Sequence, residues 1–484
     1  MKAKKNSIST SRKQAERQQI RLSSANAGQW IRARFDAAQT TRENERHWAM
    51  ADGLSADQEA RAEVRRELRR RSRYEVMNNP YALGLVQMLA NDTVGTGPRL
   101  QMLLEDEKMN DRLEADFNAW ARQIRLAQLL RLMRRARCQD GETFAVLGNN
   151  PKLKSDVKLN LTIIEADRVQ GLASITDKRD VDGIRYDDWG NPVSYRVLKY
   201  HPGDNEITIE DEAVEVPAEF MLHTYVQTRP GLHRGVPELT AALSKFANLR
   251  RYTMATLAAA ESAANFAAIL YTDSPPDGET ADLEPLDPIE LERNMMLTVP
   301  AGWKMGQLEA KHPSANYNEF VKSTLAEIAR CVCSTYGSVA GDFSGFNYAS
   351  GRLDNQIYHK SIIVDRTKWE EDILDPLLDA WLREWSLANE TILEAHPPRT
   401  WFWDGFLHVD PSKEATAQQM RLQNLTTTLA AECARDGKDY MAILRQRAKE
   451  KKLMEELGIT EEQPKPQGNG GNREDEDNGE RDQD

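Results

Sequence analysis

Apolar residues recur along most of this chain at the three- and four-residue spacing of an amphipathic helix. Between Asp111 and Arg137 this spacing predicts a helix whose buried stripe holds Leu113, Phe117, Trp120 and Ile124. Upstream, Asn78-Asn-Pro-Tyr predicts the start of another helix, because proline is tolerated in a first helical turn. Helices are therefore expected to form most of the fold.

Further helices are expected in the second half of the chain. A helix over Pro237–Leu270 would carry an apolar stripe in its first half and many alanines in its second, which favours close packing against other helices. Helix is also predicted over Phe320–Tyr336 and Ala415–Leu457. A long amphipathic segment after Leu353 contains Pro376, which is expected to kink or split it.

Between Phe144 and Val226 the hydrophobic period changes to two. Alternating runs such as Val193–Tyr200 are separated by turn signals, among them Asp182-Gly and Trp189-Gly-Asn-Pro. This pattern predicts a small antiparallel β-rich unit. A second alternating run, Met296-Leu-Thr-Val-Pro, follows an acidic, proline-rich excursion over Asp273–Pro288.

Three segments show neither period. Residues 1–24 are basic and poor in large apolar side chains, and the residues from Gln463 onward are rich in Gly, Asn, Asp and Glu, so both are expected to be disordered. Glycines interrupt Gly337–Gly351, which predicts a loop.

Composition excludes several classes of protein. At 484 residues, with 40% hydrophobic and 29% charged residues, the chain is typical of a soluble globular protein with several subdomains. Its apolar runs are far shorter than the ~18 residues that span a bilayer, and no apolar segment follows the basic N-terminus as in a secretory signal. Four scattered cysteines do not form a disulfide framework and indicate a reducing compartment.

The net charge of −12 is distributed unevenly. Residues 1–73 carry +9 and residues 461–484 carry −6, so the middle of the chain carries −15. Such an acidic body does not favour tight binding to DNA phosphates. The charged segment 61–73 is either a solvated helix face or a surface that faces a polyanion or an acidic neighbour. If it faces an acidic neighbour, Arg65, Arg66, Arg69 and Arg70 are expected to make the contact.

Candidate catalytic chemistry is sparse. Two acidic pairs, Asp140/Glu142 and Glu165/Asp167, could bind Mg²⁺, but the first also suits a turn and the second the end of a strand. Cys331-x-Cys333 has the wrong spacing for a zinc site, and both cysteines are expected in a packed interior. No nucleophile elbow, Walker loop or zinc-binding histidine pattern occurs, so no cofactor is expected.

The order of several short motifs resembles the lambda-like family of tailed-phage portal proteins. Over about residues 25–450 the motifs are Arg71-x-Arg, Asn78-Asn-Pro-Tyr-Ala, Val94-Gly-Thr-Gly, Asp140-Gly-Glu-x-Phe, Ile163-Ile-Glu-Ala-Asp-Arg, Gly183-Ile-x-Tyr-Asp, Gly190-Asn-Pro-Val-Ser-Tyr, Arg229-Pro-Gly-Leu-His-Arg-Gly-Val-Pro, Asn347-Tyr-Ala-Ser-Gly-Arg and His408-Val-Asp-Pro-Ser-Lys-Glu-Ala. The resemblance implies an α+β, mainly helical fold with wing, stem, clip and crown, assembling into a ring with a central channel.

On this resemblance the chain divides into segments. They are a basic arm (1–24), the wing (25–235, with the β-rich unit 144–226), a stem helix (237–270), the clip (272–312), a second stem helix (314–336), the tunnel loop (337–351), a kinked long helix with the wing return (352–411), the crown (412–457) and an acidic tail (463–484). The β-rich unit is an alternative location for the clip.

The resemblance also implies a function and partners. A ring, typically of twelve subunits, would assemble in the host cytoplasm and sit at one capsid vertex of the virion. It would be the channel for packaging and ejection of double-stranded DNA, and it would not recognise the DNA sequence. Its partners would be the terminase large subunit, a head-tail adaptor, and the major capsid and scaffold proteins, with no membrane. ATP hydrolysis would belong to the terminase, and the portal itself would not be an enzyme.

The resemblance places two sets of site residues. The tunnel-loop candidates are Asp342, Phe343, Ser344, Phe346, Asn347 and Tyr348, and the candidates for terminase or adaptor contact in the clip are Asp277, Glu279, Glu284 and Asp287. One alternative from a different class is a metal-dependent nucleic-acid-processing enzyme that uses Asp140, Glu142, Glu165 and Asp167. Another capsid-vertex adaptor is a third possibility, although so long a chain is unusual for it.

Overall fold

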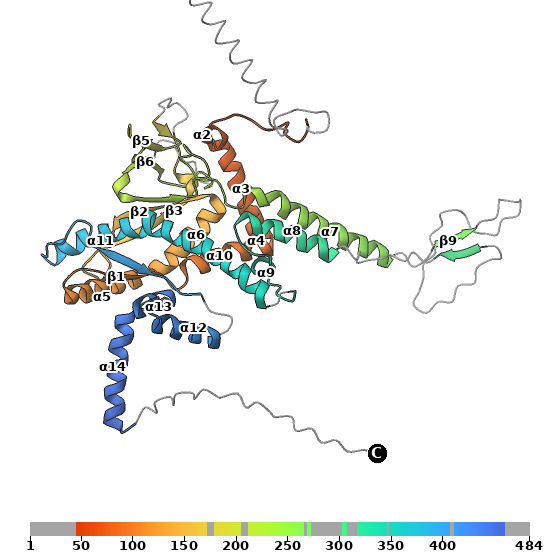
Figure 1. Cartoon of the computed structure of the whole chain (residues 1–484). Coiled ribbons are helices and arrows are strands. Elements are labelled where there is room, and N and C mark those ends of the chain that lie inside the picture. Colours follow the sequence, from red (N-terminus) through yellow and green to blue (C-terminus); the bar gives the residue numbers. More distant parts are fainter. Residues whose placement is uncertain are drawn as a thin grey trace, which may run out of the picture. The chain divides into compact units, whose positions relative to one another are not determined.

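The computed structural model describes residues 45–171, 179–204, 212–265, 269–272, 303–306, 317–345, 348–406 and 411–459. The chain divides into two units, residues 1–59 and 60–484. The described part of the first unit contains the short helix α2 (Ala56–Glu59). The second unit contains the remaining helices and strands and is mainly helical with several small antiparallel sheets (Figure 1). This confirms the predicted α+β, mainly helical class.

Helices open the second unit, and their ends follow local sequence rules. Helix α3 (Ala62–Asn78) is followed at once by α4 (Pro80–Val94). The Asn79 side chain accepts a hydrogen bond from the Tyr81 N–H, and Pro80 occupies the first helical position. The predicted helix start at this motif is therefore confirmed.

The single helix predicted over Asp111–Arg137 is two helices. They are α5 (Glu107–Gln123) and α6 (Leu126–Asp140), which are separated at Arg125, whose φ of 56° lies in the left-handed region. A residue in that conformation ends the right-handed helix and turns the chain. The predicted stripe is nevertheless buried, because the side chains on both sides of the break face one core.

The predicted β-rich unit is confirmed as two antiparallel sheets. One sheet has the strand order β3-β2-β8, from β2 (Glu142–Asn149), β3 (Leu159–Ile164) and β8 (Met221–Tyr225). The other has the order β4-β5-β6-β7, from β4 (Asp180–Val181), β5 (Ile184–Tyr186), β6 (Pro192–Leu198) and β7 (Ala213–Pro217). Strands β1 (Arg99–Met102) and β11 (Arg399–Phe402) pair separately.

Two long helices follow the sheets and lie side by side in Figure 1. Helix α7 (Leu243–Asn265) is shorter than the predicted Pro237–Leu270, because a 3₁₀ turn precedes it and Ile269 already belongs to strand β9 (Ile269–Thr272). Strand β9 pairs with β10 (Trp303–Gly306), and α8 (Tyr317–Cys331) follows. The predicted run Met296–Pro300 and both predicted disordered ends, 1–24 and 463–484, lie outside the described residues.

The predicted glycine loop is partly helical. Helix α9 (Tyr336–Ala340) covers its first residues, and α10 (Tyr348–Trp369) begins inside it. A π-helical turn, η5 (Glu370–Leu374), then separates α10 from α11 (Asp375–Ala388), so the predicted split near Pro376 is confirmed. The closing helical segment is three helices, α12 (Pro411–Gln423), α13 (Leu429–Arg435) and α14 (Tyr440–Leu457).

The largest core is rich in tryptophan. Phe117 and Trp120 of α5 pack on Trp381 of α11, with ring centroids 5.3 and 6.3 Å apart. The Trp120 indole N–H donates to the Leu159 carbonyl at 2.8 Å, which ties the core to β3. A second core joins α4 to α7, α8, α9 and α10, and a third fills the space between the two larger sheets.

The cysteines of the Cys331-x-Cys333 pair, both predicted to be packed in the interior, differ in exposure, and Cys331 is half-buried. Cys333 is exposed rather than packed, because α8 has ended and the residue has a φ of 54° that turns the chain.

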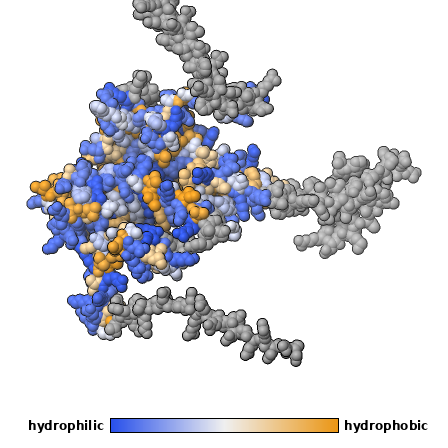
Figure 2. Space-filling view, viewed as in Figure 1, coloured by the Kyte–Doolittle hydropathy of each residue, from blue (hydrophilic) through white to orange (hydrophobic). Residues whose placement is uncertain are grey.

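Among the described residues, no helix combines the length and apolar character that crossing a bilayer requires. Hydrophilic side chains dominate the face in Figure 2, with smaller hydrophobic patches between them.

Candidate functional site

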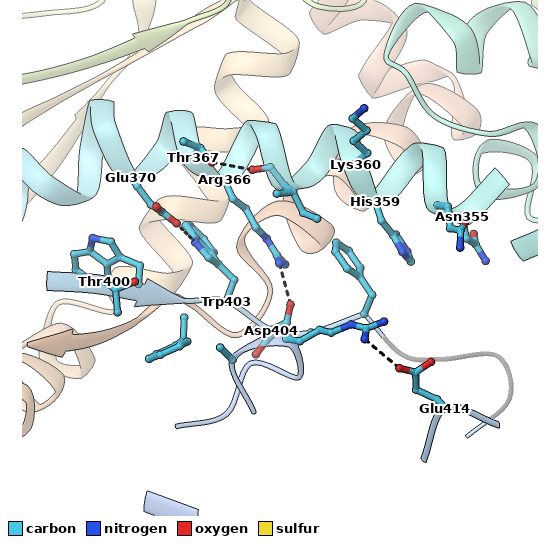
Figure 3. Close-up of a pocket in the computed structure, with 18 of the residues that line it drawn as sticks. Asn355, His359, Lys360, Arg366, Thr367, Glu370, Thr400, Trp403, Asp404 and Glu414 are labelled. Atoms are coloured by element: carbon cyan, nitrogen blue, oxygen red, sulfur yellow. Dashed lines mark hydrogen bonds and ion pairs between the residues drawn. The ribbon is translucent and has the colours of Figure 1, made fainter. Parts of the chain in front are cut away.

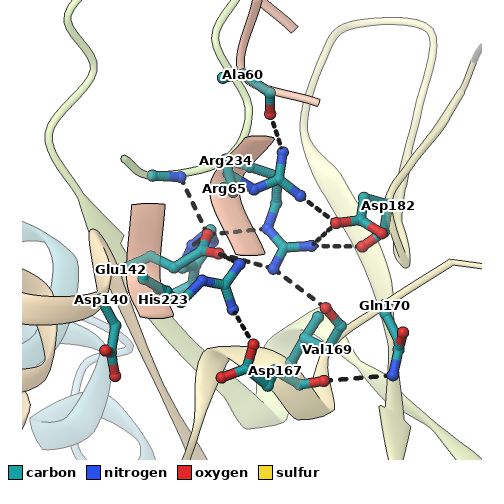
Figure 4. A network of polar contacts seen from close by, with 12 residues as sticks. Ala60, Arg65, Asp140, Glu142, Asp167, Val169, Gln170, Asp182, His223 and Arg234 are labelled. Carbon is teal, nitrogen blue, oxygen red and sulfur yellow. Dashed lines mark hydrogen bonds and ion pairs between the residues drawn. The ribbon is translucent and has the colours of Figure 1, made fainter. Parts of the chain in front are cut away.

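A buried pair of opposite charges lies where α6 meets the first β-sheet. Glu142 is the first residue of β2, and Arg234 lies in the loop that precedes α7; both side chains are fully buried (Figure 4). The Arg234 guanidinium donates to both carboxylate oxygens, from Nε at 2.8 Å and from Nη2 at 2.7 Å. The Gly235 N–H donates to the same carboxylate at 3.1 Å. This bidentate pair fixes the loop before α7 to the start of β2.

Helix α3 adds three arginines to this pair from one face, at intervals of four residues. Arg65 contacts Asp182, Arg69 donates to Asp167 at 3.0 Å, and Arg73 donates to Asp140 at 2.8 and 3.0 Å. We call these groups, together with Glu142 and Arg234, the arginine–carboxylate junction. It connects α3, α6, both larger sheets and the loop before α7.

The junction corrects the hypothesis about the arginine-rich segment. Arg65 and Arg69 are buried against acids of their own chain and are not available to an acidic neighbour. Arg66 is exposed, and Arg70 is exposed and pairs with Glu67 of the same helix. Both hypotheses assumed that the whole helix is exposed, whereas one stripe of α3 faces the protein interior.

Burial and charge move the pKa values of the junction in opposite directions. Burial alone would raise the pKa of Glu142, but the Arg234 guanidinium outweighs it and holds that pKa well below its usual range. Burial, reinforced by Arg234, lowers the pKa of Arg65 to about 10. Burial also lowers the pKa of His223, which stacks on Phe144 with ring centroids 4.2 Å apart. At neutral pH this junction therefore holds ionised Glu142 beside an uncharged imidazole.

The four candidate metal ligands lie at or beside this junction, but three of them face arginines. Asp140, Glu142 and Asp167 are each bound by guanidinium groups, with Asp167 in contact with both Arg69 and Arg73. A divalent cation would have to displace these arginines. The arrangement therefore suits a charge-balanced structural junction better than a magnesium site.

A partial cation geometry exists at the edge of the junction. Ligand atoms of Glu165, Asp167 and His201 lie within 4.8 Å of one another, and His201 Nε2 is 2.9 Å from a Glu165 oxygen. However, the Arg73 Nη2 atom is 2.7 Å from an Asp167 oxygen and already supplies the positive charge. Glu165 is exposed, so this group lacks the enclosed ligand set of a resident metal.

A second buried charge cluster joins α6 to α10. Arg134 donates to both oxygens of Glu238 at 3.1 Å and to Asp365 at 2.9 Å, and Arg137 donates to Glu238 at 3.0 Å and contacts Asp365. Burial acts to raise the pKa of Asp365, yet the two arginines bring it below its ordinary value. Glu238 is only four residues beyond Arg234, so both clusters hold the segment that leads into α7.

Helices α7 and α8 form an antiparallel pair. Lys245, near the start of α7, pairs with Glu327, near the end of α8, whereas Tyr252 stacks on Tyr317 at the start of α8 with ring centroids 5.7 Å apart. Residue numbers therefore increase along α7 in the direction in which they decrease along α8. The alanine-rich second half of α7 exposes Met254 and Leu257.

The tunnel-loop candidates lie between α9 and α10. Asp342 accepts hydrogen bonds from the Ser344 N–H at 3.0 Å, its hydroxyl at 2.6 Å and the Tyr336 hydroxyl at 3.1 Å, which closes a tight turn. Phe343 beside it is 61% exposed. The remaining candidates lack a description: Phe346, Asn347, Asp277, Glu279, Glu284 and Asp287 lie outside the described residues, and Tyr348 begins α10 without a described side chain.

A groove that the sequence did not reveal lies between α10, the segment Thr400–Phe406, and helices α12 and α13 (Figure 3). Its volume is about 700 Å³. His359 stacks on Phe406 within it, with ring centroids 3.7 Å apart. Its lining residues extend from Arg352 to Arg435, so no local sequence motif marks it.

A family model describes most of this chain. The model for phage portal proteins of the lambda family matches residues 41–362, which include the junction, α7, α8 and most of α10. The chain belongs to the lambda family of phage portal proteins. Its role is accordingly that of a portal protein, a component of the phage particle.

Individual relatives are more distant. A protein of Halomonas phage phiHAP-1 named as a probable portal protein is 26% identical over 440 residues, which cover 83% of this chain and 82% of the relative. Among solved structures, a chain in the neck of an empty gene transfer agent particle is similar with a TM-score of 0.46 and 14% identity, over 76% of this chain and 92% of that chain. A chain in the virion of the native particle has a TM-score of 0.45 and 13% identity, over 77% and 93%.

Proposed function

We propose that identical copies of this portal protein close into a ring of twelve subunits, the number usual for the family, whose channel conducts double-stranded DNA during packaging and ejection. Membership of the lambda portal family is the observation that carries this proposal. The ring would dock the terminase large subunit and the head-tail adaptor, and would contact major capsid and scaffold proteins during assembly in the host cytoplasm.

We assign the segments on the same basis. The wing is residues 25–235, α7 and α8 fall in the two stem helices, the clip is residues 272–312, and the crown is residues 412–457. Asp342, Phe343, Ser344, Phe346, Asn347 and Tyr348 would line the tunnel, and Asp277, Glu279, Glu284 and Asp287 would contact the terminase or the adaptor. The antiparallel α7–α8 pair supports the stem assignment, because it leaves the body and returns to it as a stem must.

The charge of the chain suits a conduit. Residues between 74 and 460 carry −15 per copy, and a ring multiplies this charge around the channel. Like charge on walls and phosphates keeps the duplex from adhering, whereas many free Lys and Arg side chains would bind it through counterion release. The arginines of the junction do not contradict this, because acids of the same chain neutralise them.

We further propose that the chain has no catalytic activity of its own. The acids that a metal-dependent enzyme would use are engaged by arginines at the junction. Native mass spectrometry and electron microscopy of the purified chain test the ring, with an expected mass near twelve times 54.9 kDa. A monomer under all buffers would overturn the ring, and Mg²⁺-dependent DNA cleavage that disappears in Asp167→Ala would support the enzyme instead.

A further inference from the structure

Helix α10 carries apolar side chains on two opposite sides. One side, which includes the buried Ile362, packs in the second core. On the other side Leu353, Ile357 and Val364 follow one another at intervals of four and seven residues, so they lie along one line of the helix surface. We call these three residues, together with Ile363 beside them, the outer stripe of α10.

The outer stripe is exposed in the single chain. Its four side chains are 55–65% exposed, and among the described residues no other helix exposes as many large hydrophobic side chains. Together they present roughly 200–300 Å² of apolar surface, which is a large patch for a monomer. Figure 2 shows a hydrophobic patch on this face, over α10.

Neither helix formation nor solubility explains these residues. Ile357, Ile363 and Val364 are β-branched, and β-branched side chains are poorer helix formers than the polar residues common on helix surfaces. A helix that is apolar on two opposite sides is typical of one that is covered on both. We therefore expect another surface to cover the outer stripe in the assembled protein.

An exposed cation shows what kind of surface this is. Lys360 lies between Ile357 and Val364 along α10, and its side chain points away from the groove (Figure 3). It makes no hydrogen bond or ion pair with any residue in the described ranges. The surface that covers the outer stripe must therefore combine apolar area with a carboxylate for this ammonium group.

A second copy of the chain can supply this surface, but not with its own outer stripe. Two outer stripes packed about a two-fold axis would bring both Lys360 side chains together, and like charges oppose such a contact. Elsewhere acids are in excess, because residues 74–460 carry −15 per copy. A contact between the outer stripe and a different, acidic face is heterologous, and heterologous contacts repeated from copy to copy can close a ring.

We propose that the outer stripe of α10 is a contact between neighbouring subunits and that it meets an acidic face of the next copy outside α10. The four aliphatic side chains form the apolar centre of this contact, and Lys360 pairs with a carboxylate of the neighbour. The inference rests on the proposed ring and adds to it the residues that hold one subunit to the next.

Photo-crosslinking within assembled rings tests the contact directly. A benzophenone amino acid replaces Ile357, and the rings are assembled from equal amounts of ¹⁵N-labelled and unlabelled chains. A second variant carries the benzophenone at Ile363, which leaves the centre of the stripe intact. We expect crosslinked peptides that join α10 of one chain to a segment outside α10 in a chain of the other label. Crosslinks confined to single chains, crosslinks between two α10 helices, or no crosslinks at either position would overturn the proposal.

Charged substitutions measure how much the stripe contributes to assembly. Ile357→Asp and Val364→Asp should each raise, at least about tenfold, the protein concentration at which half of the chains are in rings, because a buried aliphatic side chain is lost from the contact. Sedimentation velocity over a dilution series measures this concentration. Ile357→Leu keeps the apolar contact and should change it less than about twofold.

A matched control separates the contact from general effects of charge. Leu387→Asp introduces the same charge at a residue of α11 that is 82% exposed, and it should leave assembly unchanged. The urea midpoint of the dissociated chain should stay the same in all these variants, because each side chain is exposed in the single chain. The proposal is wrong if the two stripe variants assemble as readily as the natural chain, or if Leu387→Asp impairs assembly equally.

Lys360→Gln determines which surfaces meet. An acidic neighbour predicts that this variant assembles about two- to fivefold more weakly at low salt and that the difference disappears at high salt. A contact between two α10 helices predicts stronger assembly instead, and that result would overturn the proposal. A natural chain that forms no ring would overturn the proposed ring as well, whereas intact rings in both aspartate variants would overturn the outer-stripe contact alone.

Discussion

Arg234→Met should destabilise the protein severely, since it leaves Glu142 ionised and buried without its main partner. The substitution removes two hydrogen bonds of 2.7 and 2.8 Å to the carboxylate and one of 3.1 Å to the Val169 carbonyl. It also removes the hydrogen bonds to the carbonyl and the carboxylate of Asp182. Breaking a fully buried pair from one side costs about 3–5 kcal/mol. Because 1.4 kcal/mol corresponds to a factor of ten, the unfolding equilibrium should shift by about two to four powers of ten.

The loss of stability in Arg234→Met should also depend on pH. In the natural chain the pKa of Glu142 is depressed, so its stabilisation is present above the unfolded pKa of about 4.3 and is lost as pH falls through the folded pKa. Without Arg234, the raising effect of burial on that pKa gains weight, and protonation then relieves the buried charge. The difference in stability between Arg234→Met and the natural chain should therefore shrink as pH falls from 7 towards 4.

Urea denaturation followed by circular dichroism measures both effects. The double variant Arg234→Met/Glu142→Gln should recover part of the lost stability, because it removes the unpaired carboxylate as well. Arg66→Met on the exposed side of α3 is the matched control and should change stability by less than about 0.5 kcal/mol. A loss below 1 kcal/mol in Arg234→Met, unchanged between pH 7 and 4, would refute the reasoning.

Three further outcomes follow from single residues. Gly141→Ala should lower the melting temperature sharply, because φ is 94° and a Cβ would lie 2.4 Å from the main chain before α7, whereas Gly148→Ala, with open space, should have little effect. Trp381→Ala should cost about 3–5 kcal/mol in urea denaturation, and a loss under 1 kcal/mol would contradict its place in the core. Cys333 should react with a thiol reagent in the native protein while Cys138, buried and with its pKa raised by burial, should react only after unfolding; equal rates would contradict this difference.

Local sequence signals predicted the elements but not always their ends. The Asn79–Pro80 start of α4 and the interruption near Pro376 follow from the backbone chemistry of single residues, which acts over one helical turn. The break at Arg125 had no such signal, because an arginine in the left-handed conformation is held there by the packing of α5 and α6. Tertiary packing therefore determines the boundary between α5 and α6, which the spacing of hydrophobic residues does not predict.

The polar sites were less accessible to sequence reasoning. The acids Asp140, Glu142 and Asp167 were recognised as a cluster, but their partners on α3 lie 67 to 98 residues away. The four-residue spacing of Arg65, Arg69 and Arg73 is the one local sign that a stripe of α3 faces inward. The groove between α10, Thr400–Phe406, α12 and α13 could not be predicted from the sequence, because its lining residues come from separate segments.

The two buried charge clusters together determine how α7 can move. Arg234 and Glu238 flank Pro237 just before α7, and each is bound by side chains of α6 or of the strand that follows it. Displacing the N-terminal end of α7 would separate several buried ion pairs at once. Each broken pair would leave unpaired charges in the protein interior, which solvates them poorly. We therefore expect α7 to move together with α3, α6 and α10, rather than to hinge at the 3₁₀ turn Thr240–Ala242. If α7 is a stem helix of the ring, as we propose, a force on it would reach the rest of the subunit through these two clusters.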